Sequence, residues 1–186
     1  MTSFSIHTPA TAPEAARPIF DDVKGKFGFV PNLMGALAEA PTALEAYVTL
    51  SDIFARSSLT PAERDVVTIA VSAKNGCTYC VAAHSMSAAM KKLPEDVIAA
   101  LRDGRPIGDA RLEALRRFAE AVVEKRGWVT DDDVQAFLAA GFGRAQALDV
   151  VLGVAFKTLS NYANHLVGTP LDAAFAPRAW QPRKAG

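Results

Sequence analysis

The stretch Asn75-Gly-Cys-Thr-Tyr-Cys-Val-Ala-Ala-His84 contains both cysteines of the 186-residue chain, two residues apart, with a histidine four positions after the second. If a helix begins at Cys77, then Cys77, Cys80 and His84 stand at positions i, i+3 and i+7, which places them on one helical face. Gly76 favours a sharp turn into this helix, so that Cys77 meets free backbone N–H groups. The spacing therefore predicts two thiols and an imidazole in a single patch.

Two thiols and an imidazole suit redox chemistry, because only a thiolate attacks a peroxide or a disulfide. A free cysteine has a pKa of about 8.5, and lowering it to about 7 requires roughly 2 kcal/mol. A helix N-terminus supplies about 0.5 to 1 kcal/mol of this stabilisation. We expect an imidazolium at His84, within reach of Cys80, to supply the remainder.

Other interpretations of the two cysteines remain open. A structural disulfide across so short a loop would gain little stability. Zinc is the stronger alternative, since Cys77, Cys80 and His84 are suitable ligands, but a closed site needs a fourth ligand. Only His7 and His165 remain among the histidines, and no histidine directly follows Cys80 as a haem attachment site requires. We favour a redox dithiol and expect neither a metal nor a cofactor.

The composition excludes several classes of protein. Half of the residues are apolar, and twenty acidic residues balance twenty basic ones, which gives no indication of a nucleic-acid or anionic-membrane partner. The apolar runs are too short to span a membrane, and the N-terminus lacks the features of a signal peptide. We expect a cytoplasmic protein, and in a reducing cytosol a CxxC pair is typically catalytic or metal-binding.

Hydrophobic periodicity predicts an all-α fold without a credible strand pair. The clearest helix start is Thr60-Pro-Ala-Glu63, a capping box with proline in the first turn. The helix that follows is apolar nearly all round and should be buried. The expected helices cover residues 14–26, 32–39, 42–56, 61–75, 77–92, 94–101, 109–125, 130–140 and 144–167.

These helices form one domain over residues 14–172. Residues 1–13 lack periodicity and are expected to be a flexible lead-in. The tail, residues 173–186, is expected to pack loosely or to reach a neighbouring subunit.

The last helix carries a polar stripe opposite its apolar face. Its members fall at helical spacing and are Lys157, Ser160, Asn161, Asn164 and His165. We interpret the stripe as a solvated face; the alternative is a wall of the thiol site or of a subunit interface.

The segment Leu59-Thr-Pro-Ala-Glu-Arg-Asp-Val-Val-Thr-Ile-Ala-Val-Ser-Ala-Lys-Asn-Gly-Cys-Thr-Tyr-Cys-Val-Ala-Ala-His84 closely resembles the core of the alkylhydroperoxidase D-like family, also called the carboxymuconolactone decarboxylase-like family. Two further segments, Gly28-Phe-Val-Pro-Asn32 and Asn161-Tyr-Ala-Asn-His-Leu-Val-Gly-Thr-Pro-Leu-Asp172, resemble its peroxidase-related branch. The resemblance therefore extends over most of the chain.

This resemblance implies an all-helical subunit in a homo-oligomer, a trimer or hexamer, and a thiol peroxidase that reduces hydroperoxides. It implies that Cys80 attacks the peroxide and that Cys77 resolves the sulfenic acid to a disulfide. His84 would belong to a proton relay with a carboxylate twelve residues before Cys77. A lipoyl-type adaptor or another dithiol reductant would restore the thiols.

The sequence departs from the family pattern at two positions. Asp65 stands where the family usually has glutamate, and we expect it to be the relay carboxylate, with pairing to a lysine as its alternative role. Glu63 is the other candidate, but it has a capping role and points to nearly the opposite side of the helix. Tyr79 stands where some members have a second histidine.

Two other functions remain as alternatives to a peroxidase. The first is a lyase of the carboxymuconolactone decarboxylase type, which needs general acid and base groups and no pair of thiols. The second is a non-catalytic helical module that senses redox state or binds a metal.

Overall fold

The computed structural model describes residues 4–182, and within this part of the chain all regular secondary structure is helical, with no strand. The predicted all-α class is therefore confirmed. The elements are η1 (Glu14–Ala16), α1 (Arg17–Phe27), α2 (Asn32–Leu37), α3 (Pro41–Ala55), α4 (Pro61–Lys74), α5 (Thr78–Met90), α6 (Glu95–Asp103), α7 (Ala110–Glu124), α8 (Asp131–Ala139), α9 (Arg144–Val167) and η2 (Ala173–Arg178). No single helix in residues 4–182 is long and apolar enough to cross a membrane, although α8 and α9, bent by 113°, pass that test as a pair.

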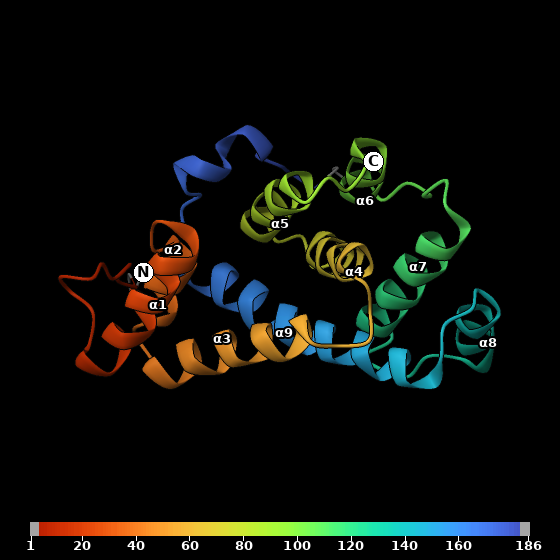
Figure 1. Ribbon diagram of the computed structural model, residues 1–186, viewed down its shortest axis with the longest axis horizontal. Coiled ribbons are helices and arrows are strands. Elements are labelled where there is room, and N and C mark those ends of the chain that lie inside the picture. Colours follow the sequence, from red (N-terminus) through yellow and green to blue (C-terminus); the bar gives the residue numbers. More distant parts are fainter. Residues whose placement is uncertain (1–3, 183–186) are drawn as a thin grey trace.

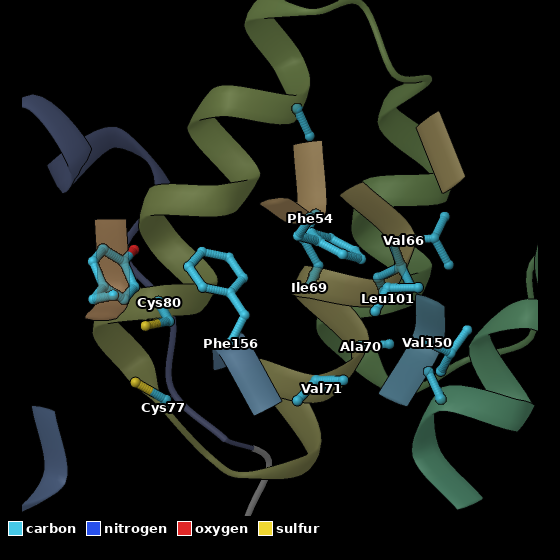
Figure 2. Close-up of a cluster of buried hydrophobic side chains, with 14 of the residues drawn as sticks. Phe54, Val66, Ile69, Ala70, Val71, Cys77, Cys80, Leu101, Val150 and Phe156 are labelled. Carbon is cyan, nitrogen blue, oxygen red and sulfur yellow. The ribbon is translucent and has the colours of Figure 1, made fainter. Parts of the chain in front are cut away.

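Helix α4 lies at the centre of the molecule, between α5, α7 and α9 (Figure 1). Its side chains are buried nearly all round, as the sequence predicted. Figure 2 shows side chains of α4 packed against residues from α3, α6 and α9. The labelled members of this core are Phe54, Val66, Ile69, Ala70, Val71, Cys77, Cys80, Leu101, Val150 and Phe156.

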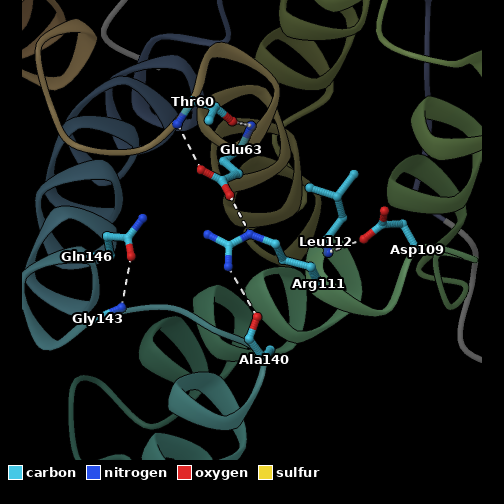
Figure 3. Close-up of polar contacts among 8 residues, drawn as sticks. All are labelled: Thr60, Glu63, Asp109, Arg111, Leu112, Ala140, Gly143 and Gln146. Carbon is cyan, nitrogen blue, oxygen red and sulfur yellow. Dashed lines mark hydrogen bonds and ion pairs between the residues drawn. The ribbon is translucent and has the colours of Figure 1, made fainter.

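The predicted capping box at the start of α4 is confirmed. Thr60 N–H donates to Glu63 Oε2 at 2.8 Å, and Glu63 N–H donates to Thr60 Oγ1 at 3.3 Å (Figure 3). The second carboxylate oxygen of Glu63 accepts from Arg111 Nε at 2.9 Å, and Arg111 Nη1 donates to the Ala140 carbonyl at 3.1 Å. Glu63 therefore joins α4 to α7 and to the end of α8, which explains a buried acid without a catalytic role.

A Schellman motif ends α4 and sets the position of the first cysteine. Gly76 adopts the left-handed conformation, with φ of 68°. Gly76 N–H donates to the Ala73 carbonyl at 3.0 Å, and Cys77 N–H donates to the Ser72 carbonyl at 2.9 Å. Cys77 then serves as the N-cap of α5. The end of the buried central helix therefore holds the backbone of Cys77 directly.

Helix α9 approaches α4 and α3 closely through Gly153. A Cβ atom at this position would lie 2.7 Å from Val67 Cγ1 and 2.9 Å from the ring of Phe54. Real Cβ contacts are longer than this, so a side chain here would force the helices apart. The close approach brings the second half of α9 beside α5.

The first 13 residues are partly outside the described structure, which begins at residue 4. From there the segment packs against α2: His7 N–H donates to the Gly35 carbonyl at 3.1 Å, and Ala12 is buried. These contacts belong to the described part of the lead-in, and its flexibility stays a prediction.

The tail packs on its own subunit as far as residue 182, and residues 183–186 lie outside the described part. Trp180 Nε1 donates to the Arg102 carbonyl at 2.8 Å, and Arg102 Nη1 donates to the Arg178 carbonyl at 2.9 Å. Just before η2, Asp172 accepts from the hydroxyl of Tyr79 at 2.5 Å. Helix η2 of the tail also contacts α5, and Ala179 and Trp180 line a cavity together with Thr78 and Tyr79 at the start of that helix.

Candidate active site

The two cysteines lie close together at the start of α5 and are reduced. Cys77 is the N-cap residue, Cys80 lies in the first turn, and each is only 1% exposed. Figure 2 shows both sulfurs projecting to the same side of the helix, with Phe156 of α9 beside Cys80. No group of three or more His, Cys, Asp or Glu side chains in residues 4–182 is arranged to hold a metal ion.

The wall facing the sulfurs is polar and belongs to α9. Asn164 Nδ2 donates to Cys80 Sγ at 3.2 Å and lies 3.8 Å from Cys77 Sγ. The Cys80 thiol also lies 3.7 Å from Ser160 Oγ. The thiols are therefore buried among groups that can hydrogen-bond to sulfur, not sealed in apolar packing.

The polar stripe of α9 was interpreted as a solvated face, and this interpretation was wrong. Lys157, Ser160 and Asn161 are fully buried, and Asn164 is 5% exposed. These four residues form the wall of the thiol site, which was the alternative interpretation. Only His165 of the stripe is exposed.

A fully buried lysine contacts the motif histidine. Lys157 Nζ lies 2.7 Å from His84 Nε2 and 4.9 Å from the centre of the Phe156 ring. Because an ammonium group can only donate, His84 Nε2 accepts, and the histidine carries its proton on Nδ1. Within the described residues Lys157 has no carboxylate partner, so the Cys80 sulfur is the anion available to balance it.

The two thiols share one proton unequally. A hydrogen bond from Cys77 lowers the pKa of Cys80 well below its usual range, and the charge of Lys157 and the Ser160 and Asn161 side chains act in the same direction. The hydrogen bond with Cys80 raises the pKa of Cys77, as does burial. Cys80 is closer to Asn164 and is the thiol next to Ser160, so we assign it the anion and Cys77 the proton.

The expected imidazolium at His84 is not present. Burial lowers the pKa of His84 well below its usual value, and the charges of Lys157 and Lys91 lower it further. His84 is therefore neutral near pH 7. The positive charge that favours the Cys80 thiolate comes from Lys157, which binds His84 from the other side of the site.

Asp65 is placed beside a lysine. Its carboxylate accepts from Lys91 Nζ at 2.8 Å; the side chain of Asp65 is 5% exposed, whereas that of Lys91 is 53% exposed. The described hydrogen bonds of His84 go to Lys157, not to Asp65. The lysine pairing that the sequence left open is thus the contact formed here, and a relay through Asp65 remains a prediction.

Contacts beyond the two cysteines and His84 also support the site. Asn161 Nδ2 donates to Ser72 Oγ at 3.3 Å, and Asn161 Oδ1 accepts from Asn75 Nδ2 at 2.9 Å, which joins α9 to the end of α4. Tyr47 of α3 stacks on Phe156, with ring centres 5.1 Å apart. Burial raises the pKa of Tyr47, and the charges of both cysteines raise it further, so its phenol stays protonated.

Two comparisons with known proteins agree with this fold and motif. The model of the carboxymuconolactone decarboxylase family matches residues 36–121, which include both cysteines and His84. An alkylhydroperoxidase D core structure, an uncharacterized peroxidase-related protein from Ralstonia eutropha JMP134, is 29% identical and superimposes with a TM-score of 0.81, covering 92% of this chain and 93% of the other.

These two matches support the resemblance to the alkylhydroperoxidase D-like, or carboxymuconolactone decarboxylase-like, family. The family match and the fold support a peroxidase-related or decarboxylase-like function.

More distant family-like structures show the same fold. A peroxidase-related protein from Silicibacter sp. TM1040 is 22% identical, with a TM-score of 0.76 over 88% of this chain and 87% of the other. The debrominase Bmp8 is 18% identical, with a TM-score of 0.79 over 96% of each chain. The search of curated proteins found no match.

Proposed function

We propose that this protein is a thiol-dependent peroxidase that reduces hydroperoxides through the Cys77/Cys80 pair. The observation that carries the proposal is the state of Cys80: hydrogen bonds from its neighbours and the buried charge of Lys157 favour its thiolate, while Cys77 keeps its proton. A thiolate with a protonated neighbour is what a two-step peroxide reduction requires.

In the first step, the Cys80 thiolate attacks the terminal oxygen of the hydroperoxide and the O–O bond breaks. The sulfur is oxidised by two electrons to a sulfenic acid, and the leaving alkoxide takes a proton from Lys157, whose contact with His84 positions both groups. In the second step, Cys77 attacks the sulfenic acid, and its proton leaves with the hydroxyl group as water. The resulting disulfide is reduced by a dithiol donor, a lipoyl-type adaptor or a similar molecule.

The oxidant must reach sulfurs that are each 1% exposed, so the site has to open during turnover. A cavity of ≈ 110 Å³ adjoins the first turn of α5 and is lined by Thr78, Tyr79 and Trp180 among others. The tail forms its outer wall. We propose that displacement of the tail from this turn admits peroxide and reductant.

A thiol titration tests the proposed function. Reduced protein should lose two thiols per chain on adding one equivalent of hydrogen peroxide, with a disulfide between Cys77 and Cys80 in the mass spectrum. Cys80→Ser should abolish peroxide consumption, and Cys77→Ser should reduce one peroxide per site and stop at the sulfenic acid. Full turnover by Cys80→Ser would overturn the assignment.

The lyase alternative rests on the name of the matching family model. Decarboxylation of a lactone should survive alkylation of both cysteines, because it needs no thiol. The metal-binding alternative would instead give stoichiometric zinc in protein purified without added metal, together with thiols that are inert to peroxide.

We also propose that the protein is a homo-oligomer that uses the outer face of α9. The side chains of Leu148, Val151, Tyr162 and Leu166 are exposed along this helix, with Ala155 near the middle. Read from either end, the stripe presents large side chains at the ends and smaller ones at the centre, so a second α9 in antiparallel orientation matches it. Such a self-complementary face is typical of a two-fold contact between identical subunits.

A further inference from the structure

Within residues 4–182, Asn164 is the residue whose side chain lies within hydrogen-bond distance of both sulfurs. Its Nδ2 lies 3.2 Å from Cys80 Sγ and 3.8 Å from Cys77 Sγ, and the residue is 5% exposed. A primary amide has two donors and one acceptor oxygen, so contacts of Nδ2 with two sulfurs use its donor capacity. These contacts leave the acceptor oxygen of the amide, Oδ1, unused.

Asn164 Oδ1 is buried and has no hydrogen-bond partner among the described residues. Leaving such an oxygen unpaired costs about 1 to 3 kcal/mol. Turning the amide over does not remove the cost, because it would aim the oxygen lone pairs at the Cys80 thiolate and leave Nδ2 unpaired. Asn164 Oδ1 is therefore free to accept a hydrogen bond from a donor that enters the site.

The chemistry of the proposed reaction supplies such a donor at this place. The terminal oxygen of a hydroperoxide carries one hydrogen and must contact Cys80 Sγ to react. Nδ2 and Oδ1 belong to one amide, so an O–H group beside Cys80 Sγ lies within reach of Oδ1. The sulfenic acid formed in the first step also carries an O–H group on the same sulfur.

We propose that Asn164 is a catalytic residue that holds the Cys80 sulfur through Nδ2 and accepts the O–H group of the hydroperoxide, and then of the sulfenic acid, through Oδ1. This proposal rests on the proposed peroxidase function. It makes the amide selective for oxidants that carry an O–H group on the atom attacked. An oxidant without one gains nothing from Oδ1.

The test compares two reactions of the Asn164→Ala variant at a pH high enough to ionise Cys80 fully in every protein. Hydrogen peroxide carries the O–H group, whereas iodoacetamide alkylates the thiolate without one. We expect Asn164→Ala to react with hydrogen peroxide at least about tenfold more slowly than the parent, equivalent to roughly 1.4 kcal/mol or more. Its rate of alkylation at the same pH should match that of the parent.

A control is Gln135→Ala, which removes an exposed amide on α8, away from the sulfurs. It should retain the peroxide rate of the parent. A hydrogen peroxide rate for Asn164→Ala equal to that of the parent, or a loss shared equally by alkylation, would overturn the role of Oδ1. Failure of the proposed function looks different, because the parent would then be alkylated but would not react with peroxide. Circular dichroism of each variant establishes that it is folded before the rates are compared.

Discussion

Lys157 Nζ lies 2.7 Å from His84 Nε2, so the motif histidine is bound by a buried lysine from α9 and not by a carboxylate from α4. The pair joins α9 to α5, the helix that begins at the two cysteines. As a result, His84 is neutral, and the positive charge of Lys157 is balanced by the Cys80 thiolate. The chemistry of the two sulfurs therefore depends on a residue 77 positions after Cys80.

Replacing Lys157 with methionine should raise the pKa of Cys80, since the charge of Lys157 lowers it. The pH midpoint of alkylation by iodoacetamide is expected to lie below about 8.5 in the parent and to rise by about one pH unit or more in the variant. Lys74→Met, which removes a lysine paired with Glu124, is the control and should leave the midpoint in place. Equal midpoints in the parent and Lys157→Met would show that another group holds the thiolate.

The same variant should change the reduction potential of the Cys77/Cys80 disulfide. Lys157 stabilises the reduced form through the thiolate, so its removal should make the potential more negative, by about 30 mV for each tenfold change in the equilibrium. Equilibration with glutathione or dithiothreitol buffers measures this shift. A more positive potential in Lys157→Met would contradict the expectation.

Gly76→Ala should destabilise the fold although nothing blocks the new methyl group. The nearest atom to a Cβ at this position is Pro182 Cγ at 4.0 Å, so the cost comes from φ of 68° alone. We expect a loss of about 1 to 2 kcal/mol in the free energy of unfolding, measured by urea titration. Gly25→Ala, inside α1 with open space around it, should change stability in the opposite direction by about 0.5 to 1 kcal/mol. A neutral Gly76→Ala would show that the turn into α5 does not depend on the left-handed conformation.

Stability should fall as the pH drops below about 6.5, and His84 should contribute to this fall. The folded protein holds His84 neutral because burial lowers its pKa, whereas the unfolded chain protonates it. The unfolded state therefore binds more protons, and the free energy of unfolding decreases by up to about 1.4 kcal/mol per pH unit from this residue. His84→Gln should show a shallower slope between pH 6.5 and 5.5 than the exposed-histidine control His165→Gln. Identical slopes would mean that His84 is charged in the folded protein.

A charge on the outer face of α9 should dissociate the oligomer. Tyr162→Glu and Leu148→Glu place a carboxylate on the exposed stripe, where a second subunit would bury it at high cost. Sedimentation velocity should show a smaller species for both, with helical content unchanged. Met90→Glu, exposed on α5 and away from this stripe, is the control and should keep the mass of the parent.

Local signals predicted much of the fold, because they act over a few residues. The capping box at Thr60 and the glycine before Cys77 define helix ends on their own, and both are present. The predicted span of the last helix, residues 144–167, also matches α9. The apolar pattern alone predicted that α4 is buried, because a helix that is apolar on every side has no polar face to expose to solvent.

The site could not be predicted to the same depth, because it depends on which face of α9 is turned inward. Periodicity placed Lys157, Ser160, Asn161 and Asn164 together but does not tell a solvated stripe from a buried polar wall. Close packing at Gly153 turns this face towards α5, and no local pattern encodes that contact. The charge of His84 was predicted wrongly for the same reason, since burial beside Lys157 is a long-range property.

The matching family model ends at residue 121, before α9 begins. It therefore includes the CxxC pair and His84 but none of the four α9 side chains that form the wall of the thiol site, Lys157, Ser160, Asn161 and Asn164. Other side chains on this last helix would therefore change the nucleophilicity of an identical pair of cysteines. A library that varies Lys157 and Asn164 therefore offers a direct way to alter the chemistry of an unchanged motif.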